Sequence, residues 1–91
     1  MVEYHVDFEI RALKALKKLD KSTANMIWSW VNKNLEGTDN PRRLGKALKG
    51  EFKRAWRYRI GDYRLICDIQ DKKVLILVLE IGNRKDIYKE R

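Results

Sequence analysis

The sequence predicts an α+β fold in which one antiparallel sheet carries a helical hairpin on one face. Three observations support this prediction. The spacing of apolar residues changes from two to three or four and back to two, turn residues join the later segments, and an unbroken apolar run lies near the C-terminal end. Ninety-one residues, 44% of them hydrophobic, are enough for one core, so we expect a single domain over residues 1–91.

The N-terminal part is expected to form one strand and then two helices. Residues 2–8 alternate between apolar and polar side chains, which is the period of a half-buried strand. From Ile10 to Leu19, and again from Ile27 to Leu35, apolar residues recur at steps of three or four, as in amphipathic helices. Asp20 is expected to cap the second helix, and Asp7 is expected to act as a helix cap too.

Three further strands are expected after Gly50, connected by tight turns as an antiparallel meander. The first is expected to end at the turn Gly61–Asp62 and to pair directly with a strand over Tyr63–Gln70. A second turn at Asp71–Lys72 leads into the apolar run Val74–Leu79, which suits a central strand covered on both faces. Together with the N-terminal strand, these segments are expected to form one sheet with both helices on one face.

Almost all of the net charge lies in one segment of the chain. Residues 42–64 hold nine basic and two acidic residues, a net charge of +7 out of +8 for the whole protein. Basic side chains neutralise phosphates, so this segment predicts a nucleic-acid ligand, RNA in particular. The expected RNA-binding residues are Arg42, Arg43, Lys46, Lys49, Lys53 and Arg54.

Within this segment, cations alternate with aromatic residues. On a strand, Arg57 and Arg59 share one face, and Trp56 and Tyr58 share the other. We therefore expect the two aromatic side chains to belong to the core rather than to stack on bases.

Several kinds of site are excluded by composition. Cys67 is the only cysteine and His5 the only histidine. An internal disulfide, a cysteine-based metal site and a histidine pair are therefore excluded. No apolar stretch is as long as a membrane span, and the N-terminus does not resemble a signal peptide. We expect a cytoplasmic protein that uses no metal or other cofactor and does not contact a membrane.

Three sequence blocks resemble the RelE/ParE superfamily, the small toxins of bacterial type II toxin–antitoxin pairs. They are Gly45-Lys46-Ala47-Leu48-Lys49-Gly50, then Trp56 to Arg64, then Glu80 to Tyr88. The last block is similar to the RelE branch, whose members cut messenger RNA on the ribosome, whereas the ParE branch poisons DNA gyrase. Both branches share one fold, so the fold does not by itself decide the activity.

The resemblance to the RelE branch implies a set of catalytic residues. The RelE branch has two basic residues on its second strand and one on the next strand, which correspond to Arg57, Arg59 and Arg64. It also has an arginine after the last strand and a tyrosine beyond it, which correspond to Arg84 and Tyr88. The sequence departs from the pattern at two places. The first two cations are often lysines in the best-known member, and Asn83 stands where many relatives have a histidine.

We therefore expect the toxin component of a type II toxin–antitoxin system. The resemblance implies a metal-independent endoribonuclease that uses the RNA 2′-hydroxyl as its nucleophile. Its implied partners are an acidic antitoxin, the ribosome and messenger RNA. Two alternatives remain open: a ParE-like inhibitor of DNA gyrase, and a module that binds RNA without cutting it.

Overall fold

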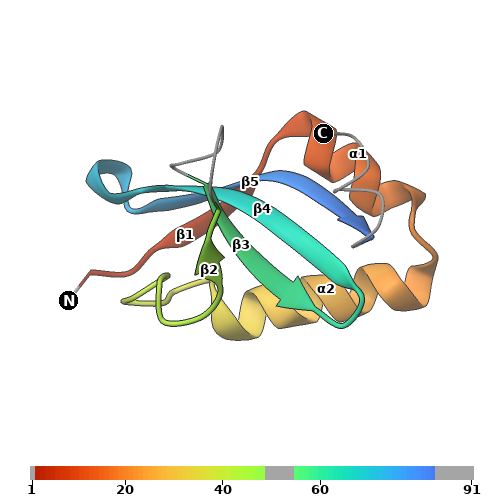
Figure 1. Ribbon diagram of the computed structural model, residues 1–91, viewed down its shortest axis with the longest axis horizontal. Coiled ribbons are helices and arrows are strands. Elements are labelled where there is room, and N and C mark those ends of the chain that lie inside the picture. Colours follow the sequence, from red (N-terminus) through yellow and green to blue (C-terminus); the bar gives the residue numbers. More distant parts are fainter. Residues whose placement is uncertain (1, 49–54, 84–91) are drawn as a thin grey trace.

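The computed structural model describes residues 2–48 and 55–83 and has a mixed five-stranded sheet with two helices (Figure 1). In chain order the elements are β1 (His5–Phe8), α1 (Ile10–Lys18), α2 (Lys21–Asn34), β2 (Lys46–Ala47), β3 (Ala55–Ile60), β4 (Tyr63–Gln70), the 3₁₀ turn η2 (Asp71–Lys73) and β5 (Leu75–Asn83). The strands lie in the order β1-β5-β4-β3-β2. The predicted α+β class, the helical hairpin and the three-stranded meander are confirmed.

The prediction of a wholly antiparallel sheet is wrong, because β1 runs parallel to β5. After β1 the helices carry the chain across to the opposite edge, and the meander then returns strand by strand until β5 lies beside β1 (Figure 1). Period two in residues 2–8 indicates a strand but carries no information about the direction of its neighbour. A short edge strand at Lys46–Ala47 was also not expected, and β5 extends past Leu79 to Asn83.

The outer edge of β1 is already occupied by backbone and side-chain hydrogen bonds. Tyr4 and the segment Gly37–Thr38 exchange two backbone bonds, Tyr4 N–H to Thr38 C=O and Gly37 N–H to Tyr4 C=O, both 2.8 Å long. The Val6 N–H donates to a carboxylate oxygen of Glu36 at 2.9 Å. These contacts cover the first part of this edge and disfavour the addition of another strand there, which is one way that proteins prevent edge-to-edge association.

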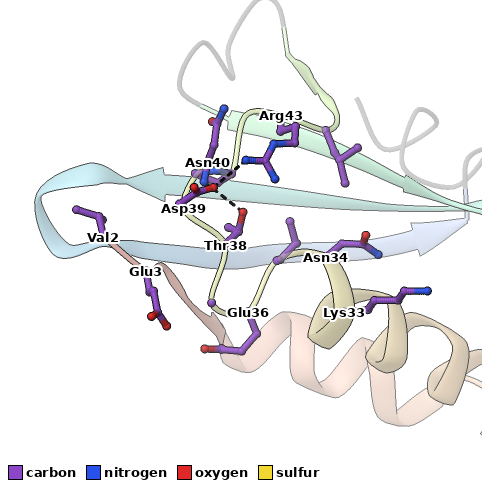
Figure 2. Close-up of a pocket in the computed structure, with 13 residues that line it drawn as sticks. Val2, Glu3, Lys33, Asn34, Glu36, Thr38, Asp39, Asn40 and Arg43 are labelled. Carbon is purple, nitrogen blue, oxygen red and sulfur yellow. Dashed lines mark hydrogen bonds and ion pairs between the residues drawn. The ribbon is translucent and has the colours of Figure 1, made fainter.

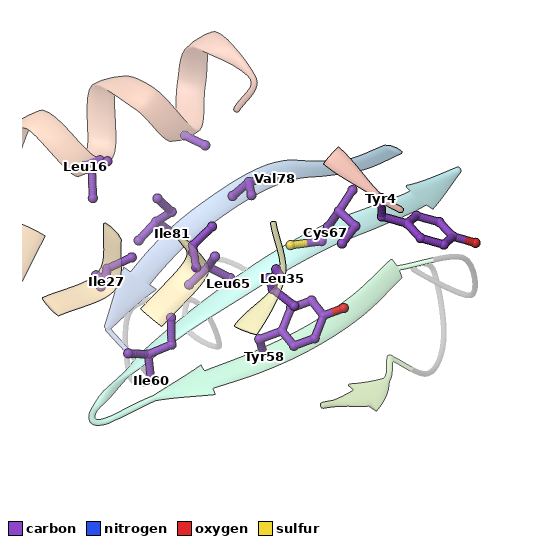
Figure 3. Close-up of a cluster of buried hydrophobic side chains, with 13 residues drawn as sticks. Tyr4, Leu16, Ile27, Leu35, Tyr58, Ile60, Leu65, Cys67, Val78 and Ile81 are labelled. Carbon is purple, nitrogen blue, oxygen red and sulfur yellow. The ribbon is translucent and has the colours of Figure 1, made fainter. Parts of the chain in front are cut away.

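The core lies between the helices and one face of the sheet (Figure 3). Leu16 of α1 and Ile27 of α2 are buried there, in the same cluster as Tyr58 of β3 and Leu65 and Cys67 of β4. These strand residues are spaced two apart, so one face of β3 and β4 meets the helices and the other faces away. Trp56 is half-buried against the same cluster, so both aromatic side chains of β3 belong to the core side as expected.

The two predicted helix caps have different outcomes. Asp20 caps α2, because its carboxylate accepts the Thr23 N–H at 3.1 Å. Asp7 caps no helix: it accepts the N–H of its neighbour Phe8, and Glu9 precedes α1 without a side-chain bond. Two residues separate Asp7 from the start of α1, which is too far along the chain for the usual capping geometry.

Neither helix of the described residues is long and apolar enough to cross a membrane.

Candidate functional site

Strand β3 carries Arg57 and Arg59 on the face of the sheet that turns away from the helices. Tyr58 lies between them and is fully buried in the core on the opposite face. Arg57 is half-buried and Arg59 is exposed. The strict alternation of this strand therefore separates its cations from its core residues, as the sequence predicted.

The antiparallel register of the β3–β4 hairpin places Arg64 directly opposite Arg59. Residues opposite each other point to the same face, with Cβ atoms about 5 Å apart. Arg64 is only 5% exposed, which makes it the one buried charged side chain among the described residues. Three guanidinium groups thus come together on one face, from two strands joined by a tight turn.

Lys46 is added to this group by the unexpected edge strand β2, where it lies opposite Arg57. We call Lys46, Arg57, Arg59 and Arg64 the cationic face. Four cationic side chains on one face of a sheet attract an anionic ligand such as a phosphate. The sequence pattern placed Lys46 among general RNA contacts but did not indicate that it lies next to Arg57.

Arg42 and Arg43, two of the predicted RNA contacts, are held elsewhere. The Arg42 guanidinium forms a two-pronged ion pair with Asp71, with N···O distances of 2.9 and 3.0 Å. Asp71 also accepts the Tyr4 hydroxyl at 2.7 Å, and these two partners hold the pKa of its carboxyl below the usual range. Asp71 begins the turn after β4 and lies seven residues beyond Arg64, roughly 23 Å along the strand at about 3.3 Å per residue. Arg42 is therefore not part of the cationic face.

Arg43 pairs with Asp39 at 2.8 Å and borders a pocket of about 520 Å³ (Figure 2). The pocket lies between the end of α2 and the loop that follows it, and both acidic and basic side chains line it. It includes no member of the cationic face. The candidate site is therefore the sheet surface, not this pocket.

The remaining predicted site residues, Lys49, Lys53, Arg54, Arg84 and Tyr88, lie outside the described residues. Their roles stay as predicted from the sequence.

The loop before β2 is attached to β3 by two aromatic side chains. The Trp56 indole N–H donates to the Leu44 carbonyl at 2.6 Å, and the buried Tyr58 hydroxyl donates to the Pro41 carbonyl. Burial raises the pKa of Tyr58 well above its usual value, so this hydroxyl remains a donor. The sequence analysis treated both rings as core residues only, because alternation reveals a side chain's face but not its polar partner.

The only cysteine and the only histidine of the chain lie away from the cationic face, one in the core and the other on the edge strand β1. Cys67 is fully buried, and that burial raises the pKa of its thiol. His5 lies on β1 with its Nδ1 atom 2.9 Å from Glu36. The carboxylate of Glu80 on β5 lies 3.5 Å from the guanidinium of Arg11 on α1. Among the described residues, no cluster of histidine, cysteine and acidic side chains is suited to a metal ion.

Comparison with known proteins supplies the family. Residues 6–88 match the family described as the ParE toxin of type II toxin–antitoxin system, parDE. The chain belongs to the RelE/ParE superfamily of type II toxins. It is 30% identical to the mRNA interferase toxin RelE of Escherichia coli, over 96% of this chain and 92% of that protein.

Solved structures of RelE toxins have the same fold as this chain. A chain of the toxin–antitoxin complex RelBE2 from Mycobacterium tuberculosis superimposes with a TM-score of 0.82 at 30% identity, covering 92% of this chain and 94% of that one. The isolated RelE toxin of E. coli gives a TM-score of 0.71 at 27% identity, covering 96% and 93%. The predicted superfamily and its RelE-like relatives are thus confirmed.

Proposed function

We propose that this toxin is a metal-independent endoribonuclease that cleaves messenger RNA on the ribosome. The observation that carries the proposal is the register of β3 and β4, which puts Arg57, Arg59 and Arg64 on one face. The 30% identity to a protein named mRNA interferase toxin supports the same activity. The proposal places the toxin in the cytoplasm, where translated message is found.

The cationic face suits the charge that develops during RNA cleavage. When a 2′-hydroxyl attacks the adjacent phosphate, negative charge gathers on the phosphoryl oxygens, and fixed guanidinium groups stabilise it. Arg59 and the buried Arg64 lie on neighbouring strands of one sheet, so their backbones are held in place before substrate binds. Because Arg64 is also buried, its guanidinium needs little reorganisation during the reaction.

Two residues outside the described part of the chain complete the proposed mechanism. By resemblance to the RelE branch, Arg84 stabilises the leaving 5′-oxygen, and Tyr88 stacks on a base or orients the 2′-hydroxyl. Neither residue is an efficient base near neutral pH. Arginine does not release its proton in proteins, and the pKa of tyrosine is ordinarily about 10. We therefore expect slow cleavage of free RNA and a need for the ribosome to position the message.

The activity is tested by inducing the toxin without an antitoxin and mapping the ends of a translated message by primer extension. New 5′ ends that appear only on translated messages, with DNA supercoiling unchanged, are the expected result. Intact messages together with relaxed or broken DNA would instead favour a ParE-like gyrase inhibitor, the alternative suggested by the family model that matches residues 6–88. Binding of RNA without either effect would favour a non-enzymatic module.

We further propose an acidic antitoxin as the protein partner, because a related structure is a toxin–antitoxin complex. The basic segment 42–64 is the expected contact, with opposite charges that speed encounter and make association depend on salt. If the antitoxin adds a strand, the occupied edge of β1 directs it to β2 among the described strands.

The contact is tested by comparing antitoxin binding of the natural toxin and of Arg57→Ala/Arg59→Ala at low and moderate salt. We expect the double variant to bind more weakly and with a smaller salt dependence. Unchanged affinity and unchanged salt dependence would remove the cationic face from the antitoxin interface.

A further inference from the structure

Trp56 has two separate environments at once. One part of its side chain packs against the core, and the indole N–H reaches over the edge of β3 to the Leu44 carbonyl, 2.6 Å away. Core packing alone would be served by any large apolar ring. The polar contact therefore ties the loop before β2 to one specific position on β3.

Gly45 shows how closely this loop is pressed against β3. Its φ angle is +81°, which L side chains rarely adopt. A Cβ atom added there would lie 2.4 Å from the Arg57 carbonyl oxygen and 2.6 Å from Trp56 Nε1. Such distances are too short for any side chain, so glycine is needed for both its conformation and its lack of a Cβ.

Lys46 follows immediately and enters β2, a strand of only two residues. β2 pairs with β3 at two positions, and just after it the Leu48 N–H donates to the Ala55 carbonyl at 3.1 Å. So short a strand has little stability of its own. Bonds that hold the preceding loop therefore contribute to keeping Lys46 opposite Arg57.

We infer that Trp56 is a positioning residue, whose indole N–H fixes the Leu44–Gly45 turn so that Lys46 projects beside Arg57 toward a nucleic-acid phosphate. This inference rests on the proposed function, because it gives Lys46 a phosphate to bind. Trp56 would thus support the RNA site although its side chain lies on the opposite face of β3. The Tyr58 hydroxyl, bound to the Pro41 carbonyl, is a second anchor of the same loop.

The test is a double-mutant cycle between Trp56→Phe and Lys46→Ala, measured as affinity of the full chain for a short single-stranded RNA across a salt series. Phenylalanine keeps an aromatic ring but removes the N–H donor. Lys46→Ala should lower the slope of log K against log salt by about 0.7, the share of one phosphate on a single strand. Trp56→Phe should lower the affinity by no more than Lys46→Ala does, roughly 3- to 10-fold for the loss of one phosphate contact near 0.1 M salt, and it should reduce the slope in part.

The decisive result is non-additivity, because two residues that act through one contact show coupling. In the Lys46→Ala background, Trp56→Phe should change neither affinity nor slope. Equal effects of Trp56→Phe with and without Lys46 would overturn the inference and leave the proposed function standing. If the natural chain binds RNA with no salt dependence, the proposed function fails, and the inference with it.

Matched variants guard against a general loss of folding. Trp28→Phe alters a tryptophan that is 47% exposed and stacked on Phe8, and it should leave RNA binding unchanged. Gly45→Ala and Gly37→Ala both place alanine at a φ of +81°, but at Gly37 the added Cβ would only meet a Glu3 carboxylate oxygen at 3.8 Å. Gly45→Ala should reproduce the loss of salt slope and Gly37→Ala should not; equal behaviour of the two would contradict the inference.

Discussion

The two faces of the β3–β4 hairpin differ in almost every physical property, although their residues alternate along the same strands. On the covered face, Tyr58, Leu65 and Cys67 are fully buried among apolar side chains from both helices. On the open face, Arg59 and Arg64 lie opposite each other, and Lys46 lies opposite Arg57.

This difference shows that residues that stabilise the fold and residues proposed to act on RNA alternate along the same strands. Burial of apolar side chains stabilises the domain, whereas concentrating cations on one face works against folding. Substitutions on one face should therefore affect stability and substitutions on the other should affect activity. The predictions below test that separation.

The largest effect is expected on the open face. Arg59→Ala should reduce cleavage of ribosome-bound message by roughly 10²–10³-fold, the usual cost of removing one preorganised charge-stabilising group. Its free energy of unfolding should change by less than about 0.5 kcal/mol, because the side chain is exposed. Single-turnover cleavage and urea unfolding measure the two quantities. Lys14→Ala, an exposed cation on α1, is the matched control and should affect neither.

Arg84→Ala extends the comparison to a residue outside the described part of the chain. We expect a similar loss of roughly 10²–10³-fold in the cleavage rate, with ribosome binding nearly unchanged, because one cation among many contributes little to binding. Single-turnover cleavage and ribosome cosedimentation report the two quantities. Cleavage near the natural rate would exclude Arg84 from the mechanism.

The covered face should show the opposite behaviour. Ile27→Ala removes a fully buried side chain of α2 and should cost about 2–5 kcal/mol of unfolding free energy. The neighbouring Met26→Ala is the control, since that side chain is 43% exposed and its loss should cost less than about 1 kcal/mol. Cleavage per folded molecule should be unchanged in both. A strong loss of activity in folded Ile27→Ala protein would show that the faces are coupled.

The smallest effect is expected at carboxylates that belong to neither face. Hydrogen bonds lower the pKa of Asp71, through Arg42 and then Tyr4, and of Glu36, through the Val6 N–H and then His5. Because these pKa values are lower in the folded chain, their stabilisation is present above the unfolded value of about 4 and is lost as pH falls below it. Urea midpoints at neutral and acidic pH should therefore differ less for Asp71→Asn than for the natural chain. Tyr4→Phe should act in the same direction, and an unchanged difference in both variants would contradict the assignment.

The sequence by itself determined the local structure and the division of faces. Changes in apolar period mark the helices and strands, because a helix and a strand expose their side chains at different intervals. The same alternation separated Arg57 and Arg59 from Tyr58. The turn at Gly61–Asp62 joins β3 directly to β4, so the hairpin itself could be predicted.

Only the tertiary structure decided which distant segments meet. Period two in residues 2–8 did not reveal the parallel partner β5, because strand direction depends on how the chain crosses the sheet. Nothing in the basic segment distinguishes Lys46, which lies beside Arg57, from Arg42, which is tied to Asp71 at the far end of the sheet. The contacts of Trp56 with Leu44 and of Arg42 with Asp71 join residues that are distant in the sequence, so no local pattern could predict them.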